Sequence, residues 1–96
     1  MPPSDEGNAR PCIRIQPYYP AEALRLRIQG WVVLDLTVDA RGIVERAEAV
    51  ASGPEGYFED AAEKSTLEWR WGSGEREIRR VLVEYVIEGE KPVTRP

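Results

Sequence analysis

The sequence predicts a small α+β domain, a two-layer sandwich in which two helices cover one face of a three-stranded antiparallel sheet. Three observations predict it. Residues 31–38 alternate apolar and polar side chains with a period of two, which is typical of a half-buried strand. Residues 58–69 repeat small and apolar side chains at helical spacing. A chain of 96 residues is long enough for one domain with one modest core.

The first helix and the first strand follow each other directly. A short helix is expected at residues 20–28, because Pro20 suits a first helical position and Ala23 and Leu26 share one face. The strand at residues 31–38 then directs every second side chain to the core. Its core-facing side chains are expected to be Val32, Leu34, Leu36 and Val38.

The second strand is expected at residues 43–51. It follows a tight turn in which Gly42 takes a left-handed conformation. The inward phase changes along this strand, and a bulge near Glu45 and Arg46 reconciles its two halves.

The second helix is expected to begin at residues 52–55, where Ser-x-x-Glu has the spacing of a capping box, and to run to about Trp69. Acidic side chains near its start suit the helix dipole. One stripe of the helix faces the core, and the other face is charged. The stripe is formed by Phe58, Ala61, Ala62, Ser65 and Trp69.

The last strand is expected at residues 78–88, after a Gly-Ser-Gly break at 72–74. The element order is therefore helix, strand, strand, helix, strand. Residues 1–11 are expected to be a flexible N-terminal segment, residues 12–89 the domain, and residues 90–96 a C-terminal tail. The core-facing side chains of the last strand are expected to be Val81, Val83, Tyr85 and Ile87.

Composition argues against several classes of function. The net charge of −4 disfavours a nucleic-acid surface. The chain has no histidine, so the usual general base and the commonest metal ligand are missing. Its single cysteine, Cys12, forms neither an internal disulfide nor a zinc site. No cofactor is expected. No apolar run reaches the roughly 18 to 20 residues that span a bilayer, and the polar start shows no signal peptide.

Other chemical interpretations of the sequence are weak. Ser73 has no histidine partner and is interpreted as a loop residue. Glu59, Asp60 and Glu63 form a solvated helix face more readily than a metal site. The three tryptophans could form a stacking surface for sugars or bases, but Trp69 falls on the core stripe. The chain is therefore not expected to be an enzyme.

A longer pattern runs in register through most of the chain. Tyr-Pro is followed three residues later by alanine, then by Ile-x-Gly-x-Val, alternating apolar residues, a turn glycine with x-Val, and an aromatic pair after the second helix. The residues are Tyr19, Pro20, Ala23, Ile28, Gly30, Val32, Leu34, Leu36, Val38, Gly42, Val44, Phe58, Trp69 and Trp71. In this pattern, from about Gln16 to Gly89, the chain resembles the C-terminal domain family of TonB, the periplasmic energy transducer. The Gly-Ser-Gly segment departs from the family, which usually has a proline there.

The resemblance implies a periplasmic protein-binding module, tethered to the inner membrane within a longer protein. It implies that the TonB box of an outer-membrane TonB-dependent receptor, a short extended peptide, pairs with the last strand. It further implies coupling to a proton-driven inner-membrane motor of the ExbB/ExbD type, through a segment N-terminal to this sequence, in transport such as siderophore uptake. The residues expected at the peptide are Gln16, Pro17, Tyr18, Arg79, Arg80, Leu82, Glu84 and Val86.

The last strand of a three-stranded antiparallel sheet is expected to be an edge, which offers unpaired N–H and C=O groups. The same edge could pair two copies of the chain, so a homodimer is a further candidate. The charges on this strand also fit a solvated edge that resists aggregation. Tyr18 and Tyr19 equally fit a role in covering the sheet or a helix.

A second class of function stays open, because fold alone does not decide function. The chain could be an accessory interaction or sensor domain of another TonB-domain membrane protein. Trp31 is expected to lie partly exposed on the sheet face away from the helices, beside a partner.

Overall fold

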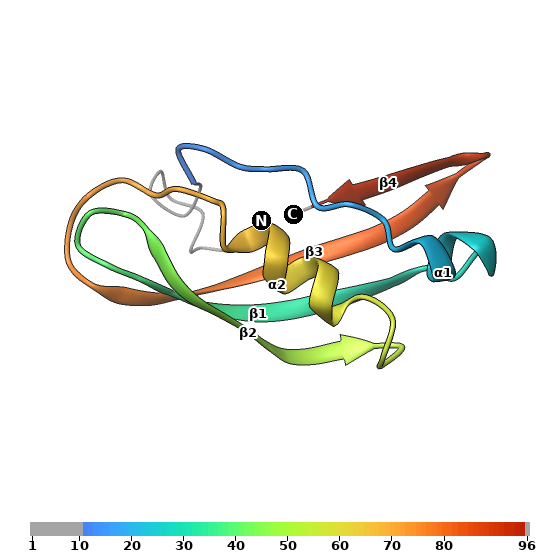
Figure 1. The fold of residues 1–96 in the computed structure, drawn as a ribbon, viewed down its shortest axis with the longest axis horizontal. Helices are drawn as coiled ribbons and strands as arrows, with labels where there is room; N and C mark the ends of the chain where they lie inside the picture. Colours follow the sequence, from blue (N-terminus) through green and yellow to red (C-terminus); the bar gives the residue numbers. More distant parts are fainter. Residues whose placement is uncertain (1–10, 96) are drawn as a thin grey trace.

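The computed structural model describes residues 11–95, which fold into one sheet with two helices (Figure 1). The sequence expectation for residues 1–11 falls almost entirely outside this range. The elements in chain order are α1 (Ala21–Arg25), β1 (Gly30–Val38), β2 (Val44–Gly53), α2 (Glu59–Thr66), β3 (Glu77–Glu88) and β4 (Lys91–Arg95).

The sheet is antiparallel throughout, with the strand order β2-β1-β3-β4. The predicted α+β class is confirmed, but the structure has four strands rather than three. Residues 91–95, which the sequence analysis placed in a tail, instead form β4 and pair with the second half of β3. Gly89, at φ 64°, opens the two-residue turn between these strands.

Pro92 explains why β4 is hard to see in the sequence, because proline lacks the N–H that a central strand needs. In the structure Pro92 lies opposite Ile87 on the outermost strand. The N–H of Ile87 donates to Gln29, on the β1 side of β3. The Ile87–Pro92 pair therefore exchanges no hydrogen bonds, and proline is tolerated at that position.

The turn and the first bulge of the β1–β2 hairpin form as the sequence predicts, and a second register shift lies between Val33 and Leu34. Gly42 has φ 89° in the turn. Thr37 pairs with Arg46 and Val38 pairs with Val44, so the extra residue of the predicted bulge is Glu45.

The start of the second helix differs from the prediction. Ser52 lies in β2, one residue before its end, instead of capping a helix, and α2 begins at Glu59 after Phe58. The hydroxyl of Ser52 donates to the carboxylate of Glu59 at 2.7 Å, and the N–H of Gly56 donates to the same carboxylate at 2.9 and 3.0 Å. The acid three residues after Ser52 is therefore not its partner, and the capping-box prediction is wrong.

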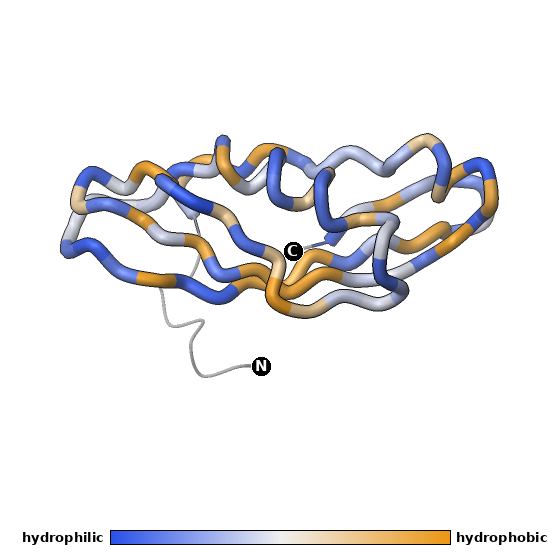
Figure 2. Tube along the Cα trace, turned by 60° about the horizontal axis from the view of Figure 1, so that its bottom comes forward, coloured by the Kyte–Doolittle hydropathy of each residue, from blue (hydrophilic) through white to orange (hydrophobic). Residues whose placement is uncertain are grey.

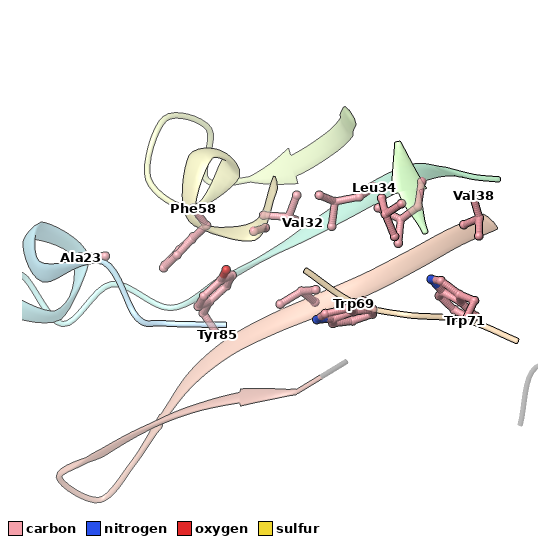
Figure 3. Packing of buried hydrophobic residues seen from close by; sticks show 12 residues of the cluster. Ala23, Val32, Leu34, Val38, Phe58, Trp69, Trp71 and Tyr85 are labelled. Carbon is pink, nitrogen blue, oxygen red and sulfur yellow. The ribbon is translucent and has the colours of Figure 1, made fainter. Parts of the chain in front are cut away.

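The core lies between the sheet and α2. Hydropathy alternates along the strands (Figure 2), and their apolar side chains meet those of the helix stripe (Figure 3). Phe58 and Tyr85 stack with their ring centroids 4.3 Å apart. The predicted stripe of α2 is buried throughout. The core cluster comprises Ala23, Val32, Leu34, Leu36, Val38, Val44, Phe58, Ala62, Trp69, Trp71, Val83 and Tyr85.

The Tyr-Pro pair fixes α1 at the end of the sheet. The Tyr19 hydroxyl donates to the carbonyl of Ile28 at 2.5 Å, which ties the two ends of the helical segment together. The Tyr19 ring meets the rings of Phe58 and Tyr85 edge-on. Tyr19 is therefore a structural anchor, and burial raises the pKa of its phenol.

Candidate peptide-binding edge

Half of β3 has a free edge. Strand β4 pairs only with residues 84–88 of β3, and β1 covers the opposite side of β3 from residue 77 to residue 85 (Figure 1). Within residues 11–95, no strand pairs with the outer side of residues 77–83. The sequence analysis took the whole last strand as an edge, and the structure restricts the open part to its first half.

One hydrogen bond shows which residues of β3 direct their backbone N–H groups toward β1 and which direct them away. The N–H of Ile87 donates to Gln29, which immediately precedes β1, at 2.7 Å. Odd-numbered residues of β3 therefore direct their N–H groups toward β1 and even-numbered residues direct theirs away, since these ladders have no register shift. In the open stretch, Ile78, Arg80 and Leu82 present the unpaired backbone groups.

The segment before α1 lies beside the end of β4. The side-chain amide of Gln16 donates to the carbonyl of Thr94 at 3.0 Å and also to its hydroxyl. Pro17 is fully buried, whereas Tyr18 is half exposed. Thr94 pairs with Tyr85, just beyond the open stretch. The structure thus places Gln16 beside the end of β4, leaves Tyr18 half exposed and buries Pro17.

The same segment is held against the end of α2 and the residues that follow it. The indole N–H of Trp69 donates to the carbonyl of Ile15 at 2.9 Å. Ile13 and Arg70 form a backbone bridge, and the guanidinium of Arg14 lies 5.8 Å from the centroid of the Trp69 ring. Residues 13–16 are therefore positioned by contacts with two separate parts of the fold.

The outer face of the open stretch combines apolar and paired charged side chains. Leu82 lies opposite Val33 of β1, and Arg80 lies opposite Asp35. The guanidinium of Arg80 donates to both carboxylate oxygens of Asp35, at 2.7 and 2.9 Å. This interaction lowers the pKa of Asp35 and raises that of Arg80. Trp31, on the same face, is partly exposed as the sequence predicts.

The remaining predicted residues lie on two different faces. Arg79 is in phase with buried Val83 and Tyr85, so its side chain lies on the helix side of the sheet. Glu84 and Val86 face away from the helices, but their backbone pairs with β4, opposite Arg95 and Val93. A strand that adds to the open stretch thus meets Arg79 and the outer-face residues, but not the backbone of residues 84–88.

Two of the three acids on α2 have structural partners. Glu59 accepts hydrogen bonds from Ser52 and Gly56, and Glu63 accepts one from the N–H of Ala49 at 2.9 Å. The hydroxyl of Ser52 is the main reason why the pKa of Glu59 is lowered. In the part of the chain described, no three His, Cys, Asp or Glu side chains are grouped so as to hold a metal ion.

Sequence reasoning missed the contribution of β4 to this region. Thr94 binds Gln16, and Arg95 marks the point where the covered part of β3 ends. A signal was present, because Gly-Glu after β3 precedes a short run in which Val93 and Thr94 have strand-forming side chains. In the described range, no helix has the length and apolar character needed to cross a membrane.

The fold is that of a small α+β domain in which, within residues 11–95, part of one edge of β3 is unpaired. The chain belongs to the family described as "Gram-negative bacterial TonB protein C-terminal", whose model matches residues 15–88. This family is a non-enzymatic transport and protein-interaction domain.

Similar proteins agree with this assignment. The chain is 36% identical over 61 residues to Protein TonB of Salmonella typhimurium strain LT2 and 34% identical over 61 residues to Protein TonB of Escherichia coli K12. These matches cover 64% of this chain but 25% and 26% of the relatives, so the chain corresponds to about a quarter of their length. A solved structure of the TonB2 protein from Vibrio anguillarum superposes with a TM-score of 0.67 at 27% identity, covering 88% of this chain and 86% of that one.

Proposed function

We propose that this domain binds an extended peptide from an outer-membrane TonB-dependent receptor by strand addition to residues 77–83 of β3. The observation that carries the proposal is the open half-edge of β3 in a member of this family. Backbone N–H and C=O groups at Ile78, Arg80 and Leu82 supply the pairing. Gln16, which bonds to Thr94 near the end of β4, and the half-exposed Tyr18 are the residues outside β3 that we propose contact the added strand.

In this role the domain works in the periplasm as part of an inner-membrane-tethered energy transducer. A segment N-terminal to the domain engages a proton-driven motor of the ExbB/ExbD type, and the domain passes mechanical force to the receptor peptide. Family membership and the similarity to TonB proteins support this proposal. Backbone pairing suits such a role, because it requires no catalytic group and depends little on the identity of individual side chains.

The test is a titration of the ¹⁵N-labelled domain with a synthetic peptide from the N-terminal region of an outer-membrane receptor of the source organism. We expect amide shifts concentrated in residues 77–83, with smaller shifts at Gln16 and Tyr18. A scrambled peptide of the same composition is the control. Shifts confined to the charged face of α2, or no shifts with any receptor peptide, would contradict the proposal and favour an accessory or sensor role.

A further inference from the structure

Arg79 lies in an unusual environment at the open stretch of β3. Its guanidinium carbon is 4.6 Å from the centroid of the Trp71 ring, a cation–π arrangement, and its side chain is 21% exposed. Arg80, its neighbour on the other face, is 67% exposed. The Arg79 guanidinium therefore lies against the Trp71 ring on the helix side of the sheet.

The hydrogen-bonding groups of this stack are incompletely satisfied. One Arg79 Nη donates to Glu77 at 2.9 Å, but the buried Nε of Arg79 has no acceptor among the residues described. The buried indole nitrogen of Trp71 also lacks an acceptor there. Buried donors without acceptors are rare and costly, so an added acceptor is favourable at this position.

The position of Arg79 relates this need to the added strand. Arg79 pairs with Leu36 of β1 on one side, and its other side is the open edge. A strand added to this edge places one side chain directly across from Arg79 and on the same face, with the Cβ atoms roughly 4.5 to 5.5 Å apart. That side chain therefore points to the helix side, toward the guanidinium over Trp71.

We propose that Arg79 is a specificity-determining residue that selects added strands with a carboxylate side chain at the helix-facing position opposite it. This inference rests on the proposed function and names the chemistry of the bound strand. A planar guanidinium with free N–H groups matches a carboxylate geometrically, and its partial burial strengthens the ion pair. Arg80 does not compete for this carboxylate, because it faces the other way and both oxygens of Asp35 already accept its hydrogen bonds.

Other charged side chains near Arg79 also affect how well an added carboxylate binds there. Arg14 lies over the neighbouring ring of Trp69, whose centroid is 6.5 Å from that of Trp71. Glu77 opposes binding of an added carboxylate, because its own carboxylate already accepts one hydrogen bond from Arg79; its side chain is 48% exposed. Glu77→Gln should therefore strengthen binding of an acidic strand.

The experiment compares two synthetic peptides that differ only in whether the central side chain ends in a carboxylate or in an amide. One has the sequence Val-Thr-Val-Glu-Val-Thr-Val between Gly-Ser ends, and the other has Gln in place of Glu. Their valines face the apolar outer surface at Ile78 and Leu82 when the central residue faces Arg79. Affinities are measured from amide shifts of residues 77–83 in the wild-type domain and in Arg79→Gln, Arg79→Lys, Glu77→Gln and the matched control Arg80→Gln.

We expect the wild type to prefer the Glu peptide by about three- to tenfold, a preference that falls as pH drops below about 4 and the peptide acid is protonated. Arg79→Gln should abolish the preference and Arg79→Lys should retain part of it. Arg80→Gln changes a residue of the same edge and can alter both affinities, but it should leave the ratio of the two affinities unchanged. The Lys variant keeps the test valid if the Gln variant fails to fold.

Three results would overturn the inference in distinguishable ways. Equal binding of both peptides, with shifts in residues 77–83, would reject the carboxylate preference and leave the proposed function intact. Absence of shifts in residues 77–83 with these peptides and with receptor peptides would reject both. Equal loss of the preference in Arg79→Gln and Arg80→Gln would show a general charge effect and would also reject the role of Arg79.

Discussion

Gln16 and Thr94, 78 residues apart in the sequence, are joined by two hydrogen bonds from a single side-chain amide. Gln16 belongs to the segment that leads into α1, and Thr94 lies near the end of β4. This contact closes the domain, because it fixes the strand that covers half of the β3 edge to a segment packed beside the end of α2.

Gln16→Ala should loosen β4. The variant leaves the hydroxyl of the buried Thr94 without this partner, so we expect a loss of about 0.5 to 1.5 kcal/mol in the local stability of β4. Hydrogen exchange of the amides in residues 91–95 should become faster, while exchange in β1 stays unchanged. Tyr18→Ala is the control, since that ring is half exposed and makes no such contact. Equal protection of β4 in wild type and Gln16→Ala would contradict the prediction.

Ending the chain after Gly89 should lengthen the open edge. Without β4, residues 84–88 join residues 77–83 as unpaired strand, and two copies can pair along the longer edge. We expect a concentration-dependent dimer in sedimentation and tighter binding of receptor peptides. A truncated domain that stays monomeric up to about millimolar concentration, and binds no tighter, would show that β4 does not limit access.

The parts that the sequence predicts well have a local cause. Leu34 and Leu36 are fixed by strict alternation in β1, and Phe58 and Trp69 by helical spacing in and around α2; all four side chains are buried. The parts that it misses depend on distant partners. Ser52 bonds to Glu59 because β2 ends beside α2, and no local spacing reveals that geometry.

The candidate site follows the same division. The outward phase of Arg80 and Leu82 could be predicted from alternation, and so could the inward phase of Arg79. The length of the free edge could not, because it depends on β4, whose Pro92 is tolerated only at the outermost position of the sheet. The stacking of Arg79 on Trp71 joins residues of β3 and the segment after α2, which only the fold brings together.

Gly42→Ala should destabilise the domain by more than the loss of turn propensity alone would. Gly42 has φ 89°, and a Cβ at this position would lie 1.9 Å from the carbonyl oxygen of Trp71, which is backbone and cannot move aside. We expect a loss of about 2 kcal/mol or more in the free energy of unfolding by urea denaturation. The control is Gly74→Ala, where a Cβ meets nothing within 4 Å. Similar losses in both variants would contradict the steric argument.

Ser52→Ala should raise the pKa of Glu59 toward its ordinary value, because the Ser52 hydroxyl is the main group that lowers it. A lowered pKa in the folded state means that the ionised acid stabilises the fold above its unfolded pKa and loses that contribution as pH falls through the folded pKa. The variant should therefore lose about 0.5 to 1 kcal/mol near neutral pH and less near pH 2. Carboxyl ¹³C titration gives the pKa, and Ser73→Ala, at an exposed site, is the control. An unchanged pKa of Glu59 would contradict this assignment.

Leu82→Pro should weaken peptide binding without a comparable loss of stability. The N–H of Leu82 points to the open side, so proline removes a donor for the added strand while the pairing of β3 with β1 keeps its own hydrogen bonds. We expect receptor-peptide affinity to fall by about fivefold or more, the effect of one lost backbone hydrogen bond plus local distortion. Leu82→Ala is the matched control, since it removes the side chain but keeps the N–H, and it should bind within about threefold of wild type.

Glu84→Pro should instead disturb β4, because the N–H of Glu84 points toward Arg95. Amide shifts and thermal unfolding of the three variants separate the two effects. Wild-type affinity in a folded Leu82→Pro variant would exclude backbone pairing at this part of the edge.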